Sequence, residues 1–156
     1  MSLPVRDGFE LSETRRTLPI ALLRLRERLM AEFRPILTAH GTTEQQWRVL
    51  RVLMEVDEID ASDLAERACI LAPSLSRILK TLDARGFVAT DRHPGDARRA
   101  RIRLTTEGMR FIRTITPESA AAYARLEARI GRERIQSLLI DLDEALRALD
   151  DDPEAP

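Results

Sequence analysis

The chain has 156 residues, enough for one compact domain and too few for a large multidomain enzyme. Hydrophobic residues make up 44% of it and charged residues 33%, so a folded core is expected. The net charge is −1, no apolar run approaches the roughly 18 residues that span a bilayer, and no secretion signal opens the sequence. One cysteine and two histidines exclude an internal disulfide and argue against a zinc cluster. We therefore expect a soluble, cytoplasmic protein without a metal or other cofactor.

The charges are unevenly distributed along the chain. Between Ala72 and Leu104, eight basic residues stand against three acidic ones, a local net charge of +5. From Asp141 to Pro156, seven acidic residues stand against one arginine, a local net charge of −6. This asymmetry lets a nearly neutral protein stay soluble while one face binds phosphate groups. The middle of the chain is therefore the candidate nucleic-acid interface.

Two helices are predicted before this basic segment. Apolar residues at three- and four-residue spacing predict a long amphipathic helix over residues 17–39, with Pro35 bending or loosening its end. Thr43 and Gln46 have the spacing of a capping box, so a second helix is expected from there to about Val56.

Two further helices and a hairpin are predicted next. Asp60 caps a short helix, a turn at 69–72 follows, and a helix of about thirteen residues opens at Pro73 and stops at Gly86. Alternation of polar and apolar residues then predicts a two-stranded β-hairpin with its tip at 94–100. Two long helices with apolar stripes and an acidic tail complete the chain.

This order of elements is that of a winged helix-turn-helix, so we expect a mainly α fold with a small β-hairpin. Arginine binds guanine edges at two points, lysine favours phosphates, and an arginine at a hairpin tip suits a narrow minor groove. The predicted DNA-binding residues are Ser74, Ser76, Arg77 and Lys80 on the second helix of the motif and Arg98, Arg99 and Arg101 in the hairpin. The competing interpretation is that these charges only solvate an outer face.

The run from Asp96 to Gly108 resembles the wing and the following helix start of MarR-type regulators, the multiple-antibiotic-resistance regulator family. Within that family, residues 18–24, 43–50 and 68–74 resemble the branch that represses homoprotocatechuate degradation operons. The resemblance implies a homodimeric transcriptional repressor that binds double-stranded DNA and is released by a small aromatic carboxylate. Two-fold symmetry of the dimer implies a pseudo-palindromic operator.

The resemblance also divides a single regulator domain, residues 1–156, into functional parts. Residues 42–107 are expected to form the DNA-binding winged helix-turn-helix, and residues 12–40 and 108–150 the dimerisation helices. Residues 151–156 form the acidic tail. The apolar stripes of the first and last helices support this division, because so small a DNA-binding part cannot cover both of them.

The effector site is predicted less directly. The resemblance implies a pocket between the dimerisation helices and the DNA-binding part. A carboxylate needs a cation, which Arg16, Arg24 or Arg48 can supply, while Trp47 provides an apolar wall. The alternative is that Trp47 belongs to the core and the arginines form surface or dimer ion pairs.

Other functions were weighed against this interpretation. The six glycines form no phosphate-binding pattern, and no nucleophile has a neighbouring base, so an enzyme is not expected. A module whose helix-turn-helix binds only protein, and a regulator of this family with a different ligand, remain alternatives. An oxidant sensor through Cys69 is a further alternative, although we expect that thiol to be buried between two helices, without a cation nearby.

Overall fold

The computed structural model describes residues 14–92, 95 and 100–150 of the chain. Its helices are η1 (Thr14–Arg16), α1 (Leu18–Ala39), α2 (Glu44–Met54), α3 (Ala61–Ala68), α4 (Ala72–Ala84), α5 (Thr106–Ile130) and α6 (Arg132–Asp150). Its strands are β1 (Ile59–Asp60), β2 (Val88–Asp91) and β3 (Arg101–Leu104). The chain forms two compact units, Met1–Glu118 and Ser119–Pro156, with the boundary inside α5.

Local signals define the helices of the first unit. At the start of α2, Thr43 Oγ1 accepts a hydrogen bond from the Gln46 amide at 3.1 Å, and Gln46 Oε1 accepts one from the Thr43 amide at 3.1 Å. Asp60 caps α3 by accepting from the Asp63 amide at 2.9 Å. Both predicted caps are confirmed, because each satisfies amides of the first turn that have no partner within the helix.

Two details of the helices differ from the prediction. The sequence predicts Thr17 as a cap of α1, and Thr17 is the N-cap residue, but it makes no side-chain cap bond and its hydroxyl instead donates to the Thr14 carbonyl at 2.9 Å. Helix α1 ends at Ala39, as predicted, with Pro35 inside it. Helix α4 begins at Ala72, so Pro73 occupies the second helical position, where its missing amide hydrogen is still tolerated.

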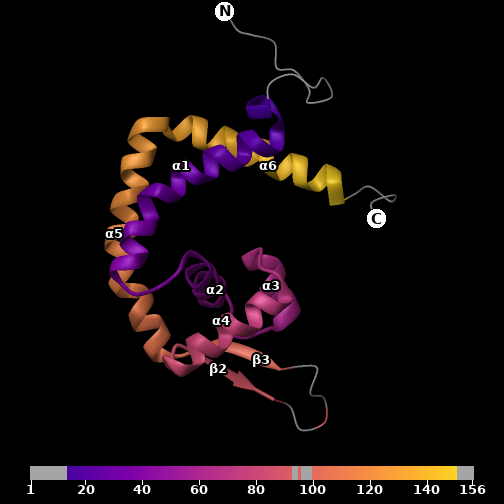
Figure 1. The fold of residues 1–156 in the computed structure, drawn as a ribbon, viewed down its shortest axis with the longest axis vertical. Helices are drawn as coiled ribbons and strands as arrows, with labels where there is room; N and C mark the ends of the chain where they lie inside the picture. The colour runs from indigo at the N-terminus through magenta and orange to yellow at the C-terminus, as the bar shows by residue number, and fades with distance from the viewer. Residues whose placement is uncertain (1–13, 93–94, 96–99, 151–156) are drawn as a thin grey trace, which may run out of the picture. The chain divides into compact units, whose positions relative to one another are not determined.

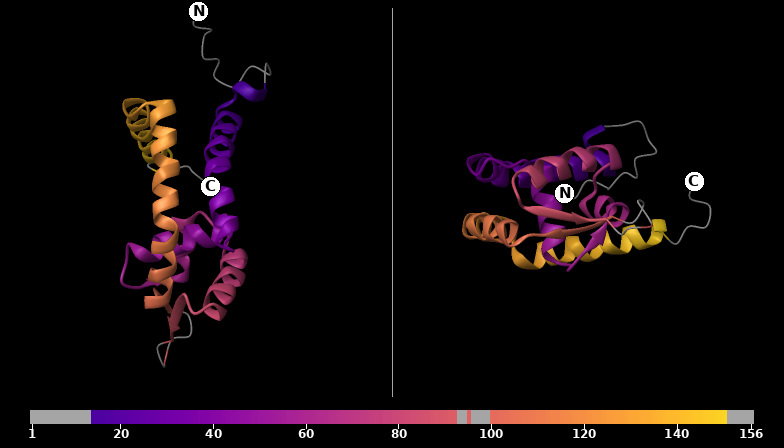
Figure 2. Two further views of the ribbon diagram at one scale, coloured as in Figure 1. Left: turned by 90° about the vertical axis from the view of Figure 1, so that its left-hand side faces the viewer. Right: turned by 90° about the horizontal axis from the view of Figure 1, so that it is seen from below.

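The predicted hairpin is formed by β2 and β3 (Figures 1 and 2). It is part of a three-stranded antiparallel sheet in the order β1-β3-β2. Strand β1 pairs Ile59 with Ile102, and both side chains are buried. The expectation of two strands was therefore incomplete. A two-residue strand shows no alternation of its own, and it exists because β3 offers it an edge next to the core.

The core of the first unit joins the three helices α2, α3 and α4 to the sheet and to the start of α5. Its fully buried large side chains include Leu50, Leu53, Leu64, Leu82, Ile102 and Ile112. Gly108 lies in the first turns of α5, where an added Cβ would clash with the Phe87 carbonyl oxygen and with Leu104 Cδ1. Close approach of α5 to the backbone between α4 and β2 therefore requires glycine at this position.

The second unit contains the remainder of α5 and all of α6. None of the described residues of α6 is buried, and large apolar side chains including Leu139, Leu146 and Leu149 are exposed along it. In the parts of the chain that the structure describes, no helix is both long and apolar enough to cross a membrane.

The contacts of Gly108 lead to a stability prediction. We expect Gly108→Ala to lower the free energy of unfolding by about 1–3 kcal/mol, because the new methyl group meets backbone atoms that cannot move aside easily. Urea denaturation followed by circular dichroism at fixed protein concentration measures this. The matched control is Arg113→Ala, at an exposed position of the same helix, which should stay within about 0.5 kcal/mol of the parent. Equal stability of the two variants would contradict the close approach.

Candidate nucleic-acid interface

Helix α4 presents two different faces. Leu75, Ile78 and Leu82 are buried in the core, which fixes the rotation of the helix about its own axis. The opposite side carries Ser76, Arg77 and Lys80, all exposed, and Ser74 is half-buried in the first turn. Among the described residues, neither the Arg77 nor the Lys80 side chain has an ion-pair partner. The two cations are therefore available for an external anion.

Gly86 ends α4 and connects it directly to the sheet. Its φ of +74° lies in the left-handed region that the predicted helix stop requires, and this prediction is confirmed. The Phe87 amide then bonds back to the Leu82 carbonyl at 3.0 Å. This tight return places strand β2 immediately after the recognition-type helix, as a winged helix-turn-helix requires.

Two arginines of the sheet lie beside acidic side chains. Arg101 Nε is 3.7 Å from Glu58 Oε1, and Arg103 Nε is 3.3 Å from Asp91 Oδ2. Each of these side chains is at least 40% exposed, and such ion pairs contribute at most about 1 kcal/mol, so a phosphate can compete for either arginine. The predicted tip residues Arg98 and Arg99 lie outside the described residues.

Arg85 is basic but is held within the fold. Its guanidinium lies over the ring of Phe87 at 4.6 Å and over that of Phe111 at 4.9 Å, and these rings stack on one another 4.5 Å apart. Arg85 Nη1 also donates to the Gly41 carbonyl at 2.8 Å. Arg85 therefore joins the end of α4 to the α1–α2 turn and to α5.

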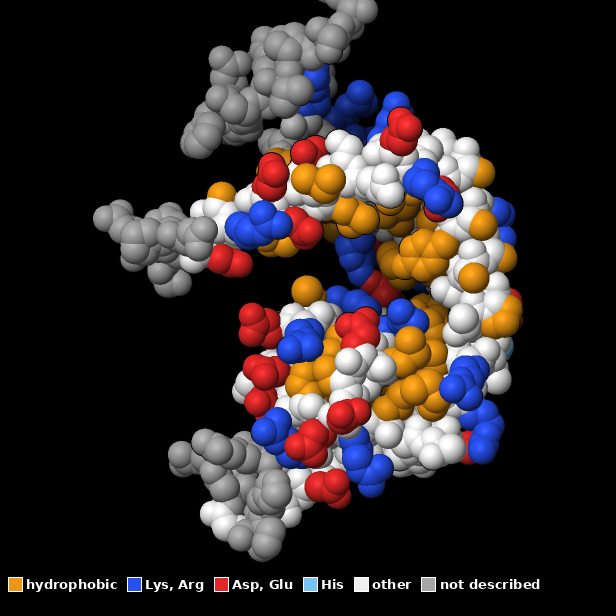
Figure 3. Space-filling view, turned by 180° about the vertical axis from the view of Figure 1, so that it is seen from behind, with side chains coloured by type: hydrophobic (Ala, Val, Ile, Leu, Met, Phe, Trp, Pro, Cys, Tyr) orange, Lys and Arg blue, Asp and Glu red, His pale blue; other side chains and the backbone are white. Residues whose placement is uncertain are grey.

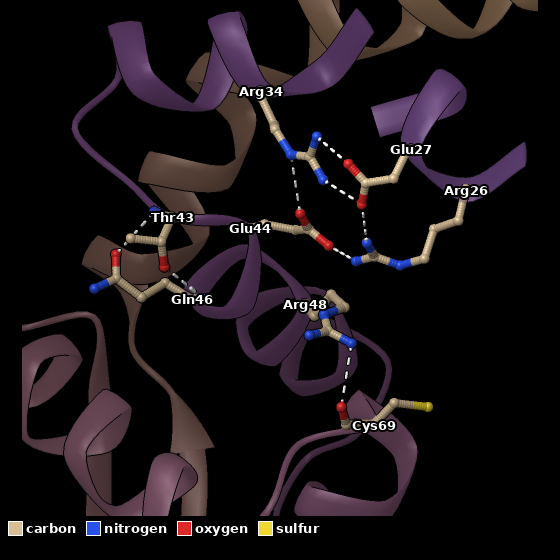
Figure 4. A network of polar contacts seen from close by, with 8 residues as sticks. All are labelled: Arg26, Glu27, Arg34, Thr43, Glu44, Gln46, Arg48 and Cys69. Carbon is tan, nitrogen blue, oxygen red and sulfur yellow. Dashed lines mark hydrogen bonds and ion pairs between the residues drawn. The ribbon is translucent and has the colours of Figure 1, made fainter. Parts of the chain in front are cut away.

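A network of ion pairs joins α1 to the start of α2 (Figure 4). Arg34 donates to both carboxylate oxygens of Glu27, at 2.8 and 2.9 Å, and its Nε lies 3.3 Å from Glu44 Oε2. Arg26 pairs with both Glu27 and Glu44. The hydrogen bond from Arg34 lowers the pKa of the Glu27 carboxyl and, reciprocally, raises the pKa of Arg34. The network anchors α1 beside the N-terminus of α2.

Arg48 is a partly buried cation without an ion-pair partner in the described part of the chain. Its Nη1 donates to the Cys69 carbonyl at 3.2 Å, whereas its Nε is buried without a hydrogen-bond partner in the described part of the chain. Burial lowers the pKa of Arg48, and the nearby positive charge of Arg26 lowers it further. Trp47 is partly buried against the core. An anion next to the accessible part of the Arg48 guanidinium would offset the repulsion between the two guanidinium groups.

The predicted effector residues are only partly brought together. Arg48 and Trp47 are neighbours on α2, whereas Arg16 in η1 and Arg24 on α1 are exposed. The cation that acts on Arg48 is Arg26, which is not among the predicted effector residues. Arg24, Arg26 and Arg28 are all exposed on α1, and what sets Arg26 apart is its approach to Glu44 and Arg48 of α2, which the sequence of α1 does not show.

Cys69 corrects an expectation. The thiol was predicted to be buried, but Cys69 is exposed and ends α3 with a left-handed φ of +52°. This backbone conformation turns the following residue, Ile70, into the core and leaves the cysteine outside. No cation was expected near Cys69, but Arg48 donates a hydrogen bond to the Cys69 carbonyl. Figure 4 shows the thiol itself directed away from the Arg48 guanidinium.

These features together define a class. A short helix, a tight turn, a helix with a buried apolar stripe and an exposed cationic face, and an antiparallel hairpin make up a winged helix-turn-helix of the kind that binds DNA.

The comparisons with known proteins agree with this class. A model described as MarR family matches residues 40–99. The homoprotocatechuate degradative operon repressor of Escherichia coli is 42% identical over 128 residues, which are 82% of this chain and 86% of that protein. The HTH-type transcriptional regulator FarR of Neisseria gonorrhoeae is 42% identical over 132 residues, 85% of this chain and 90% of that protein.

A solved structure adds a ligand-bound relative. The crystal structure of NadR in complex with 4-hydroxyphenylacetate is 40% identical, covers 86% of this chain and 98% of its own, and superposes with a TM-score of 0.76. The chain belongs to the MarR family of transcriptional regulators.

The exposure of Cys69 can be tested directly. The thiol should react with Ellman's reagent in the native protein at a rate within about tenfold of the unfolded chain, because no burial protects it. Absorbance at 412 nm measures the reaction, with Cys69→Ser as the control that should give no signal. A thiol that reacts only after denaturation would show that the side chain is covered in solution.

Proposed function

We propose that the chain is a homodimeric, sequence-specific DNA-binding repressor of an aromatic-acid catabolic operon, of the homoprotocatechuate or hydroxyphenylacetate type. An aromatic carboxylate releases it from its operator. The protein acts in the cytoplasm, where such an operon lies, and is not an enzyme. The observation that carries this proposal is the exposed face of α4, with Arg77 and Lys80 opposite a fully packed stripe, in a chain similar to an operon repressor over most of its length.

The DNA contacts follow from the chemistry of each side chain. Arg77 reads a guanine by two hydrogen bonds, and Lys80 binds a phosphate. Ser76 bonds a base or a phosphate, and Ser74 adds a phosphate contact at the helix N-terminus. In the β-hairpin, Arg101 contacts the sugar-phosphate backbone of the DNA, and Arg98 and Arg99 enter the minor groove.

Dimerisation is supported by apolar surface on both units. In the first unit, α1 exposes Leu18, Leu22 and Leu23, and in the second unit α6 exposes Leu139 and Leu149. Figure 3 shows apolar side chains lying open among charged ones on one face of the molecule. A second copy of the chain is the proposed cover for both surfaces. Residues 12–40 and 108–150 then serve dimerisation, residues 42–107 bind DNA, and residues 151–156 are a tail.

The effector is proposed to bind at Arg48. The Arg48 guanidinium, beside the charge of Arg26, offers a cation to an aromatic carboxylate, and the partly buried Trp47 ring offers an apolar wall. The complex of the related NadR with 4-hydroxyphenylacetate supports this ligand class. Arg16 and Arg24 remain alternative cations. To release DNA, the ligand must prefer the arrangement of the dimer that does not bind the operator.

A second candidate function is a regulator of the same family with another signal. FarR and the operon repressor are equally similar to the chain, at 42% identity each. The exposed thiol of Cys69 is accessible to an oxidant, so an oxidant is an alternative signal. Cys69→Ser separates the two signals. An aromatic acid should still release this variant from DNA, whereas a peroxide response would be lost.

The DNA contacts lead to a first functional prediction. With an operator isolated by in vitro selection, Arg77→Ala should weaken specific binding by about 1–3 kcal/mol and relax the preference at one base pair of each half-site. Lys80→Ala should weaken specific and random duplexes alike, because it binds phosphate. Fluorescence anisotropy measures both. The selected sequence should be a pseudo-palindrome with half-site centres about 10 bp apart. Equal losses on specific and random DNA for both variants would show that Arg77 reads no base.

The effector site leads to a second prediction. Millimolar 4-hydroxyphenylacetate should raise the operator Kd of the parent protein, and Arg48→Gln should reduce that response by about tenfold or more, because a charged hydrogen bond to the ligand is lost. Arg16→Gln and Arg24→Gln test the alternative cations in the same assay. Arg28→Gln, at an exposed position of α1, is the matched control and should respond as the parent does.

Each failure has its own meaning. If no hydroxyphenylacetate changes DNA affinity in the parent protein, the proposed ligand class is wrong. If the parent responds and Arg48→Gln responds equally, the placement of the pocket is wrong and the repressor proposal stands.

A further inference from the structure

Leu71 is an unusual residue at the N-terminus of α4. It is the N-cap residue, with φ −66° and ψ 141°, and it makes no side-chain cap hydrogen bond. The residue is 79% exposed, more than any other large apolar residue in the described part of the chain. A single exposed leucine is ordinary on a protein surface, but this one occupies a position where the helix itself favours another residue type.

The neighbouring helices show what a cap normally provides in this chain. Helix α2 is capped by Thr43 and helix α3 by Asp60, each through a side-chain bond to a backbone amide. Serine, threonine, aspartate and asparagine are preferred at N-cap positions, and leucine is among the poorest choices. Among these three helices, α4 therefore starts without the stabilisation that the other two have.

The backbone explains why the side chain points outward. Leu71 is four residues before Leu75, so a continuous helix would place it on the buried stripe. Because Leu71 has the extended conformation of an N-cap residue, its side chain leaves that stripe. The preceding residue, Ile70, is buried. Ala72 and Pro73 are also exposed, so the tip of α4 is a short apolar surface. The exposed Ser76 and Arg77 lie in the following turn of the same helix.

We infer that Leu71 is a specificity-determining residue that packs on the C5-methyl group of a thymine in the major groove. The inference rests on the proposed function. A recognition helix contacts base edges mainly with its N-terminal residues, and the thymine methyl is the apolar group that a base pair displays in the major groove. An aspartate cap at this point would repel phosphates, whereas a leucine excludes water from the methyl group.

The inference assigns different chemistry to adjacent parts of one helix. Leu71 selects a thymine by apolar contact, with Ala72 beside it, and Arg77 selects a guanine by hydrogen bonds six residues, or nearly two turns, further along. The absence of a polar cap on α4 then has a functional reason, because the position serves the DNA and not the helix.

Uracil lacks only the methyl group of thymine, so it provides the test. Each thymine of the selected operator is replaced in turn by deoxyuridine, at symmetric positions of both half-sites. For the parent protein, replacement at one position should raise Kd by about fourfold per half-site, the loss expected for one buried methyl group. For Leu71→Ala the same replacement should leave Kd unchanged, because the partner of the methyl group is gone.

Two further variants separate reading of the base from a role in folding. Leu71→Asn supplies an ordinary cap, so its thermal midpoint should equal or exceed that of the parent while its sensitivity to uracil is lost. Lys80→Ala is the matched control on the same helix: it should bind more weakly overall and keep the full effect of uracil. Sedimentation confirms that each variant has the same oligomeric state as the parent.

The outcomes are distinct. The inference is wrong if uracil weakens binding equally in the parent and in Leu71→Ala, or at no position in the parent. It is also wrong if Leu71→Ala and Leu71→Asn both unfold at lower temperature or change the oligomeric state, since Leu71 then packs against protein. If selection enriches no DNA sequence at all, the proposed function itself fails and the inference fails with it.

Discussion

The packing of α4 against the core is the constraint on which the rest of the first unit depends. Leu75, Ile78 and Leu82 are fixed by a cluster that α2, α3 and β3 share, and each such side chain stabilises the fold by about 1.5–3 kcal/mol. A helix held in this way cannot rotate about its axis without exposing its apolar stripe. The opposite face, with Arg77 and Lys80, therefore has one orientation already in the absence of DNA. Little conformational entropy of the helix is then lost when DNA binds.

The distribution of charge has to be interpreted through contacts and not through counts. The central segment carries a net charge of +5, yet Arg85 is held over two phenylalanine rings and Arg101 and Arg103 lie beside carboxylates. Among the described residues of this segment, the cations without such partners are Arg77 and Lys80 on α4 and Arg92 just after β2. Arg48 is a different case. Burial and the nearby Arg26 both lower its pKa and so disfavour its charged form, which a bound anion would stabilise.

Features that depend on neighbours in the sequence could be predicted, and features that depend on distant segments could not. The caps at Thr43 and Asp60 and the stop at Gly86 each involve residues within a few positions, so their signals are present in the sequence itself. Strand β1 exists through pairing with β3, about forty residues away, and Arg26 meets Glu44 across two helices. The exposure of Cys69 and Leu71 follows from single backbone conformations in a turn, which apolar periodicity does not encode.

The turn between α1 and α2 is held from two sides. His40 at the end of α1 lies 2.7 Å from Glu118 of α5, and the carbonyl of the next residue, Gly41, accepts the hydrogen bond from Arg85. The second of these bonds uses a main-chain acceptor, so it depends on the path of the backbone, with φ of +65° at Gly41, and not on which side chains the turn carries. Most side chains of this turn can therefore change during evolution without loss of the hydrogen bond from Arg85 to the Gly41 carbonyl, which connects the end of α1 to the C-terminal end of α4.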